Sequence, residues 1–154
     1  MSTEFSAPLL RIIDDMAPLT ERFAAAGYRL YLVGGVVRDH LLGLERGDSD
    51  LDATTDARPA EIKALVSNLA EAVWSQGERF GTIGAQINGK PYEITTHRAE
   101  VYADSSRKPT VEFGTDIRAD LERRDFTVNA MAIDLHEQTL VDPFGGRADL
   151  ADNV

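Results

Sequence analysis

The stretch Tyr28-Arg-Leu-Tyr-Leu-Val-Gly-Gly-Val-Val-Arg-Asp39 places a strand, two glycines and the start of a helix in immediate succession. Its apolar run over residues 28–33 predicts a buried strand, and residues 36–42 have the pattern of a helix. Backbone amides at a helix start bind phosphate, and Gly34 and Gly35 carry no side chain to obstruct its approach. Arg38, about one turn into the helix, could add two charge-assisted hydrogen bonds to the phosphate through its forked guanidinium group. Taken singly, the stretch also fits a tight strand–helix turn without a ligand.

The next segment, Asp48-Ser-Asp-Leu-Asp-Ala53, carries carboxylates at alternate positions. If it is a strand, its period of two places Asp48, Asp50 and Asp52 on one face while Leu51 points into the core. A solvated acidic turn is the competing interpretation, whereas a calcium loop is excluded because its required Gly and Glu are missing. Closely spaced carboxylates suit Mg²⁺, which leaves positions for phosphates and water. This pattern is typical of a phosphoryl-transfer site.

Apolar spacing predicts further elements around these motifs. We expect a helix over residues 9–26, broken or kinked at Pro18, and a helix that Asp56 and Pro59 open and that runs to about residue 69. Residues 82–88 and 90–98 alternate as strands, with a hairpin turn at Asn88-Gly89. The other expectations are a turn over residues 43–47, an irregular stretch over 100–108, a helix over 117–124, a short segment over 126–131 and a hairpin over 133–141.

These elements indicate an α/β (α+β) fold, with a small mixed sheet and flanking helices, in one domain over residues 1–154. The 43% of apolar and 27% of charged residues match a soluble globular chain. The absence of cysteine excludes a disulfide scaffold, Cys-ligated zinc and a Cys nucleophile. A formal charge of −10 argues against wrapping a polyanion over the whole surface, so any nucleic-acid contact must be local or lie outside this chain. Because no membrane span or targeting segment is visible, we expect no membrane role and a cytoplasmic location.

Two further segments carry residues suited to catalysis. Glu93 points opposite to Ile94, and it becomes a third carboxylate if its strand neighbours the Asp strand. The segment Arg123-Arg-Asp-Phe-Thr-Val-Asn129 combines two cations, a carboxylate and an amide. The C-terminal end of a helix, where arginines interact favourably with the helix dipole, explains it equally well. The three histidines lack metal-ligand spacing, so we expect them to be surface or packing residues: His40, His97 and His136.

Taken together and in this order, the motifs resemble the head domain of bacterial-type (class II) CCA-adding tRNA nucleotidyltransferases. The related poly(A) polymerases share them, and both groups belong to the DNA polymerase β superfamily. The matching segments are Leu32-Val-Gly-Gly-Val-Val-Arg-Asp39, Asp50-Leu-Asp-Ala-Thr-Thr55, Glu93-Ile-Thr-Thr96, Arg123-Arg-Asp-Phe-Thr-Val-Asn-Ala130 and Asp142-Pro-Phe-Gly-Gly-Arg147. The resemblance covers nearly the whole chain from about Tyr28 onward, and it implies a nucleotidyltransferase head fold.

The resemblance also implies roles for single residues. Asp50 and Asp52 match the metal-binding pair, and Glu93 matches the third acidic residue of the centre. The residues that correspond to nucleotide-binding positions are Gly34, Gly35, Arg38, Arg124, Asp125 and Asn129. Residues 98–109 lie where the family has a flexible loop beside its active site. The implied cofactor is a pair of Mg²⁺ ions, or Mn²⁺ in their place, which would lower the pKa of the RNA 3′-hydroxyl.

The implied activity is transfer of nucleotides from CTP and ATP to the 3′ end of tRNA. In this interpretation residues 1–27 form an N-terminal helical segment and residues 28–150 the catalytic core, while the neck, body and tail of the family are expected to be absent. The neck selects the base, and the body and tail bind the tRNA. Two alternatives stay open: the head of a poly(A) polymerase, and a metal-dependent nucleotide-binding module without turnover.

Overall fold

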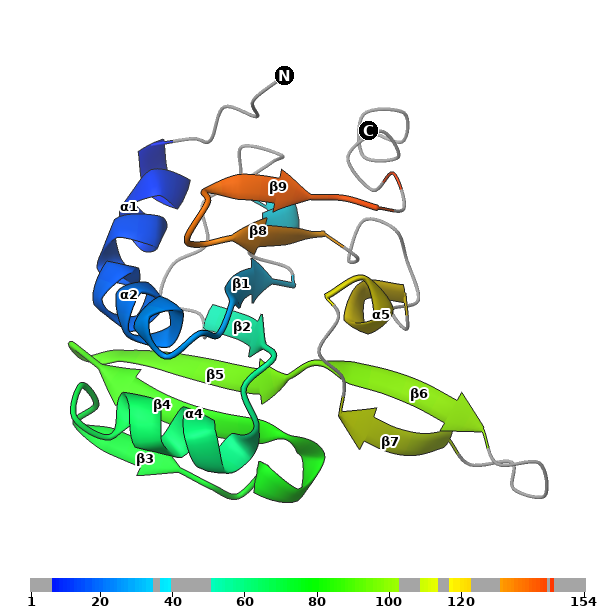
Figure 1. Cartoon of the computed structure of the whole chain (residues 1–154). Helices are drawn as coiled ribbons and strands as arrows, with labels where there is room; N and C mark the ends of the chain where they lie inside the picture. Colours follow the sequence, from blue (N-terminus) through cyan, green and yellow to red (C-terminus); the bar gives the residue numbers. More distant parts are fainter. Residues whose placement is uncertain are drawn as a thin grey trace.

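The computed structural model describes residues 7–34, 37–39, 51–102, 109–113, 117–122, 131–143 and 145. Residues 37–39 are helical. The other elements, shown in Figure 1, are α1 (Ala7–Asp15), α2 (Ala17–Ala25), β1 (Leu30–Val33), β2 (Leu51–Thr55), α4 (Pro59–Val66), β3 (Ala72–Trp74), η1 (Glu78–Phe80), β4 (Thr82–Ile87), β5 (Lys90–Thr96), β6 (Arg98–Tyr102), β7 (Pro109–Phe113), α5 (Ile117–Glu122), β8 (Ala132–Asp134) and β9 (Thr139–Val141).

A mixed sheet of seven strands, in the order β3-β4-β5-β2-β1-β8-β9, organises the molecule. Strands β2 and β5 pair in parallel, and every other pair in this sheet is antiparallel. Strands β6 and β7 form a separate two-stranded ribbon that projects from one end of β5 (Figure 1). The predicted mixed sheet with flanking helices is therefore confirmed, and it is larger than the small sheet expected.

The sheet buries one face against helices and leaves much of the other open. Helices α1, α2 and α4 contribute Leu9, Phe23 and Ile62 to the main core, where they meet Leu32 and Ile94 of the sheet. The side chains of strands alternate between faces, so the neighbours of Leu32 and Ile94 point the other way. On that opposite face α5 covers only a small cluster around β1 and β8: Tyr31, Val33, Leu121 and Ala132.

The β4–β5 hairpin turns as the sequence predicts. Asn88 and Gly89 have φ angles of 52° and 76°, so both turn residues take the left-handed conformation that a type I′ turn requires. Lys90 Nζ lies 2.5 Å from Asp15 Oδ2 and ties this turn to the end of α1. The hairpin thus fixes the register between β4 and β5.

Two details of the helices differ from expectation. The N-terminal helix does break, at Met16, and Pro18 lies in the first turn of α2, where a missing N–H is tolerated. Asp56 does not cap α4, because the cap is Arg58, whose N–H donates to Glu61 Oε1 over 3.1 Å. Asp56 instead accepts a hydrogen bond of 2.9 Å from the backbone N–H of Arg29. The helix ends at Val66 rather than near residue 69.

The prediction for residues 100–108 was wrong at its start, because residues 100–102 belong to β6. Strands β3 and β7 were not expected either. The helix α5 and the β8–β9 hairpin lie where the sequence predicts them. The predicted turn over residues 43–47 lies outside the described residues, as does most of the segment 126–131. Among the helices that are described, none has the length and apolar character needed to cross a membrane.

Two adjacent leucines of α1 test how far the N-terminal helices support the sheet. Leu9 is 1% exposed in the core and Leu10 is 41% exposed. Replacing Leu9 by Ala should lower the free energy of unfolding by about 2–5 kcal/mol, because it leaves a cavity against the sheet. Leu10→Ala is the matched control, and its cost should stay below about 1 kcal/mol. Urea unfolding of both variants measures the difference, and equal costs would contradict the packing described.

Candidate functional site

The register of three strands brings two acidic side chains together. Strand β2 lies between β1 and β5, and Asp52 pairs with Val33 on one side and with Glu93 on the other. Neighbouring strands lie about 4.8 Å apart, and paired residues point to the same face. Both carboxylates are exposed. The pairing of β2 with β5 confirms that the strand of Glu93 neighbours the strand of Asp52. The interpretation of Glu93 as a third carboxylate required this.

Gly34 completes the same corner of the sheet. It follows β1 directly and has a φ of +86°, a conformation that side chains disfavour. A Cβ atom at this position would lie 3.4 Å from Oδ2 of Asp52. The missing side chain therefore leaves open the space beside the Asp52 carboxylate, where a cation or a phosphate could approach.

Residues 37–39, which come shortly after this glycine, are helical. The amides of Val37 and Arg38 donate to the Gly34 carbonyl over 3.1 and 3.5 Å. The Arg38 guanidinium is about one-third exposed, and its Nε lies 3.1 Å from Oδ1 of the buried Asp39. Asp39 thus orients the cation that the sequence assigns to phosphate binding. The sequence did not predict this role of Asp39. In a chain with so many acidic residues, an aspartate next to an arginine does not by itself indicate a site.

A buried polar layer lies on the same face, next to Asp52. The Oγ1 of Thr54 donates to the Thr95 carbonyl over 3.0 Å and lies 2.8 Å from Nδ1 of His97. Because the carbonyl can only accept, the Thr54 proton is committed to it, and His97 Nδ1 must donate. The His97 ring is 1% exposed and lies 5.7 Å from the ring of Tyr31. His97 is therefore a packing residue, as predicted, and His136 is exposed.

Tyr31 links this layer to a charged cluster at the other end of β1. Burial raises the pKa of the Tyr31 phenol, so the group stays neutral and its oxygen accepts from Arg29. A hydrogen bond with Tyr31 in turn raises the pKa of Arg29. Arg29 lies 3.6 Å from Asp134, and Asp134 Oδ1 accepts from the amides of His136 and Glu137, both over 3.0 Å. One arginine and two backbone amides thus hold Asp134 in place.

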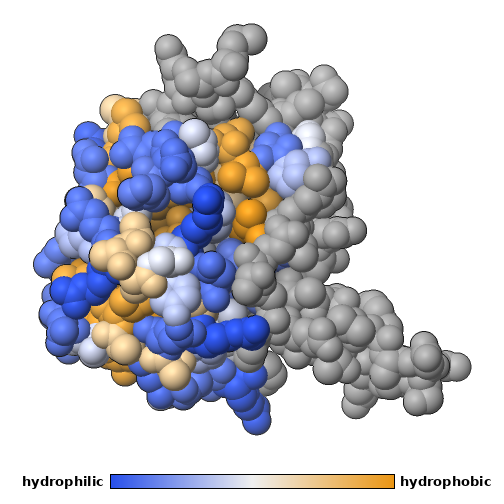
Figure 2. Space-filling model, in the orientation of Figure 1, coloured by the Kyte–Doolittle hydropathy of each residue, from blue (hydrophilic) through white to orange (hydrophobic). Residues whose placement is uncertain are grey.

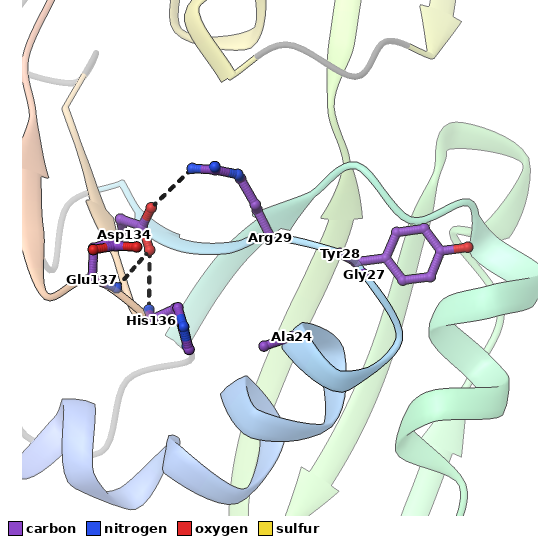
Figure 3. Close-up of a pocket in the computed structure, with 7 residues that line it drawn as sticks. All are labelled: Ala24, Gly27, Tyr28, Arg29, Asp134, His136 and Glu137. Atoms are coloured by element: carbon purple, nitrogen blue, oxygen red, sulfur yellow. Dashed lines mark hydrogen bonds and ion pairs between the residues drawn. The ribbon is translucent and has the colours of Figure 1, made fainter.

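A surface hollow of about 230 Å³ adjoins this cluster (Figure 3). Arg29, Asp134 and Glu137 line it, while the ring of Tyr28 points away from Asp134 (Figure 3). Arg29 precedes β1, whereas Gly34 follows it, so the hollow and the two carboxylates lie at opposite ends of the same strand. The hollow is therefore separate from the carboxylate site.

The other predicted site residues are not placed by the structure. Asp50, Gly35, Arg124, Asp125 and Asn129 lie outside the described residues. Within the described ranges, no group of three His, Asp or Glu side chains is close enough to hold a metal ion. The described part of the site is thus the pair Asp52 and Glu93 beside Gly34, and the Asp50–Asp52 metal pair stays a prediction.

The surface around these elements is mostly polar. On the face shown in Figure 2, hydrophilic residues cover most of the coloured area, and hydrophobic residues form separate patches between them. Three large hydrophobic side chains are notably exposed in the described part of the chain: Leu10, Val73 and Trp74.

Comparison with known proteins gives a consistent result. Residues 30–154 match the Poly A polymerase head domain family. A CCA-adding enzyme of Lactobacillus helveticus is 43% identical over 138 residues, which cover 89% of this chain and 33% of that enzyme. Among solved structures, the Bacillus stearothermophilus CCA-adding enzyme in complex with CTP has a TM-score of 0.73 and 35% identity, over 95% of this chain and 32% of that one. The Thermotoga maritima CCA-adding enzyme complexed with tRNA has a TM-score of 0.68 and 28% identity, over 95% and 32%. The chain spans about a third of the length of these proteins.

Gly34 and Gly89 both have a positive φ, so together they distinguish the cost of backbone strain from an effect on the cation site. Ala at Gly34 or at Gly89 must adopt a positive φ, and each substitution should cost about 1 kcal/mol of stability, measured by thermal unfolding. Only at Gly34 does the new methyl group meet Asp52, since nothing lies within 4 Å of a Cβ at Gly89. Gly34→Ala should therefore weaken Mn²⁺ binding in a calorimetric titration, and Gly89→Ala should not. Equal binding by both variants would show that Gly34 does not border the cation site.

Proposed function

The chain belongs to the Poly A polymerase head domain family, and from this premise we propose that it is the catalytic part of a nucleotidyltransferase that adds nucleotides from CTP and ATP to the 3′ end of tRNA. Relatives that cover most of the chain are named CCA-adding enzymes, which favours CCA addition over poly(A) addition. Similar structures that contain CTP or tRNA support the two kinds of substrate. The observation that carries the proposal is the register that sets Asp52 beside Glu93 and Gly34.

The carboxylate pair fits a divalent cation. The family uses divalent metal, and we propose Mg²⁺ as the ion, with Mn²⁺ as a substitute. Two exposed carboxylates on neighbouring strands offer the hard oxygen ligands that Mg²⁺ prefers, and they leave coordination positions for phosphate oxygens. Asp52 and Glu93 would hold the metal together with Asp50. When bound, the metal lowers the pKa of the attacking 3′-hydroxyl and stabilises the charge on the leaving pyrophosphate.

The chain's own residues supply position and charge. Gly34 leaves the space that the triphosphate needs beside Asp52. Arg38, oriented by Asp39, adds positive charge to this side. The remaining nucleotide contacts are proposed for Gly35, Arg124, Asp125 and Asn129 from the motifs that contain them. Positioning and electrostatic stabilisation account for the rate in such a site.

The whole reaction needs more than this chain provides, because base selection and tRNA binding are proposed to lie in the part of the enzyme that its relatives have in addition. The location proposed for the activity is the cytoplasm, where a cysteine-free chain needs no oxidising environment. A nucleotide-binding module without turnover would show the same site but no transfer. Incubation of this chain, joined to that additional part of a relative, with CTP, Mg²⁺ and a tRNA that lacks its 3′ end separates the two, since only a catalytic head extends the RNA.

Removal of one carboxylate tests the site. Asp52→Asn should weaken Mg²⁺-dependent CTP binding at least about tenfold. Loss of a group that only orients a metal ligand already lowers metal affinity by about that factor, and loss of the ligand itself should cost no less. Isothermal titration calorimetry of CTP with the 154-residue chain measures the effect. Asp14→Asn, at an exposed position of α1, changes the net charge equally and should leave binding unchanged. CTP binding by Asp52→Asn at the parent's affinity would refute the assignment.

The same variant should fold normally. Asp52→Asn removes like-charge repulsion with Glu93 while keeping the shape of the side chain, so its melting temperature without metal should equal or exceed that of the parent. Circular dichroism thermal scans measure it. A clear loss of stability would mean that Asp52 has a structural role in the sheet.

A further inference from the structure

An exposed tryptophan lies in the same row of the sheet as the two carboxylates. Trp74 on the edge strand β3 pairs with Gly84 on β4, Gly84 pairs with Glu93 on β5, and Glu93 pairs with Asp52 on β2. Residues in such a row point to one face, at about 4.8 Å per strand. The geometry of a Cβ built at Gly84 confirms this, because it would lie 2.9 Å from Cε3 of the Trp74 ring.

The glycine gives the ring its position. With hydrogen in place of a side chain at Gly84, the indole can lie across β4, about 5 Å nearer to Glu93 than its own strand. Aromatic rings do shield strand glycines, and this accounts for the buried part of the ring. Trp74 nevertheless remains 42% exposed, on the face that also exposes Asp52 and Glu93.

The chemistry of the proposed reaction decides what meets this ring. In an in-line displacement, the attacking hydroxyl approaches the phosphorus opposite the leaving pyrophosphate. Gly34 and the helical segment that we assign to the triphosphate lie on the β1 side of Asp52. The acceptor must then approach from the β5 side, where Glu93 is followed by Gly84 and Trp74.

We propose that Trp74 is a stacking platform for a base near the reacting 3′ end of the acceptor RNA. This inference rests on the proposed function. Stacking suits a chain with a net charge of −10, because it holds a single strand through the flat faces of its bases rather than through its phosphates. It also tolerates any base, which an acceptor site needs when the terminal nucleotide changes after each addition.

The chain supplies its own probe, because Trp74 is its only tryptophan. The fluorescence of the 154-residue chain is followed while a short single-stranded RNA ending in cytidines is added at low ionic strength. A base that stacks on the indole should quench the emission to a saturating value. An abasic oligonucleotide of equal length carries the same charge and should not quench. Equal effects of the two, or no quenching by either, would overturn the proposal.

Variants separate stacking from a purely structural role. The affinity for the same RNA, labelled for anisotropy, should fall about tenfold in Trp74→Leu and should stay close to the parent in Trp74→Phe. Val73→Ala is the control, since Val73 pairs with Ala85, points to the other face and is 39% exposed. Parent-like binding by Trp74→Leu, or equal loss in Val73→Ala, would contradict stacking.

A parallel titration with CTP and Mg²⁺ distinguishes the failure of this inference from the failure of the proposed function. If CTP binding depends on Asp52 but RNA does not quench the Trp74 fluorescence, the stacking proposal is refuted and the catalytic site is retained. Base-dependent quenching without CTP binding would show that Trp74 stacks on bases, but it would overturn the catalytic assignment and with it the role at a reacting 3′ end.

Discussion

The candidate site depends on the position of one short strand. Strand β2 pairs antiparallel with β1 and in parallel with β5, and this sets Asp52 between Val33 and Glu93. A shift of one residue would turn Asp52 into the core and Leu51 out to solvent. The alternation of Leu51, Ala53 and Thr55 on the helix-covered face prevents that shift, because these side chains are buried there. The core thus determines where the carboxylates lie.

The two sides of Asp52 differ in a way that fits a directional reaction. On the β1 side lie Gly34, whose missing side chain leaves space beside Asp52, and Arg38, whose positive charge favours an anion. On the β5 side lie Glu93, a bare glycine and an aromatic ring, which together favour a neutral, flat group. The layer of Thr54, His97 and Tyr31 supports both sides from one face of the sheet.

Sequence patterns predicted the features of the fold that depend on interactions between residues close together in the chain. The Asn88-Gly89 turn, the break before α2 and the β8–β9 hairpin all follow from backbone preferences over a few residues. Strand β3 was missed because it is only three residues long and is held by its pairing with β4. The ribbon β6–β7 was missed because its two strands pair across residues 103–108, and that mostly polar stretch made the whole segment resemble a loop. The neighbourhood of Trp74 and Glu93 depends on the register of three strands, which no single segment reveals.

A cation held jointly by Asp52 and Glu93 should couple the effects of changing them, and a double-mutant cycle measures that coupling. Mn²⁺ binding is measured by electron paramagnetic resonance for the parent, Asp52→Asn, Glu93→Gln and the double variant. If both carboxylates bind the same ion, each single change should weaken binding, and the second change should add far less than its own separate effect. Fully additive effects, or parent-like binding by either single variant, would show that the two carboxylates do not form one site.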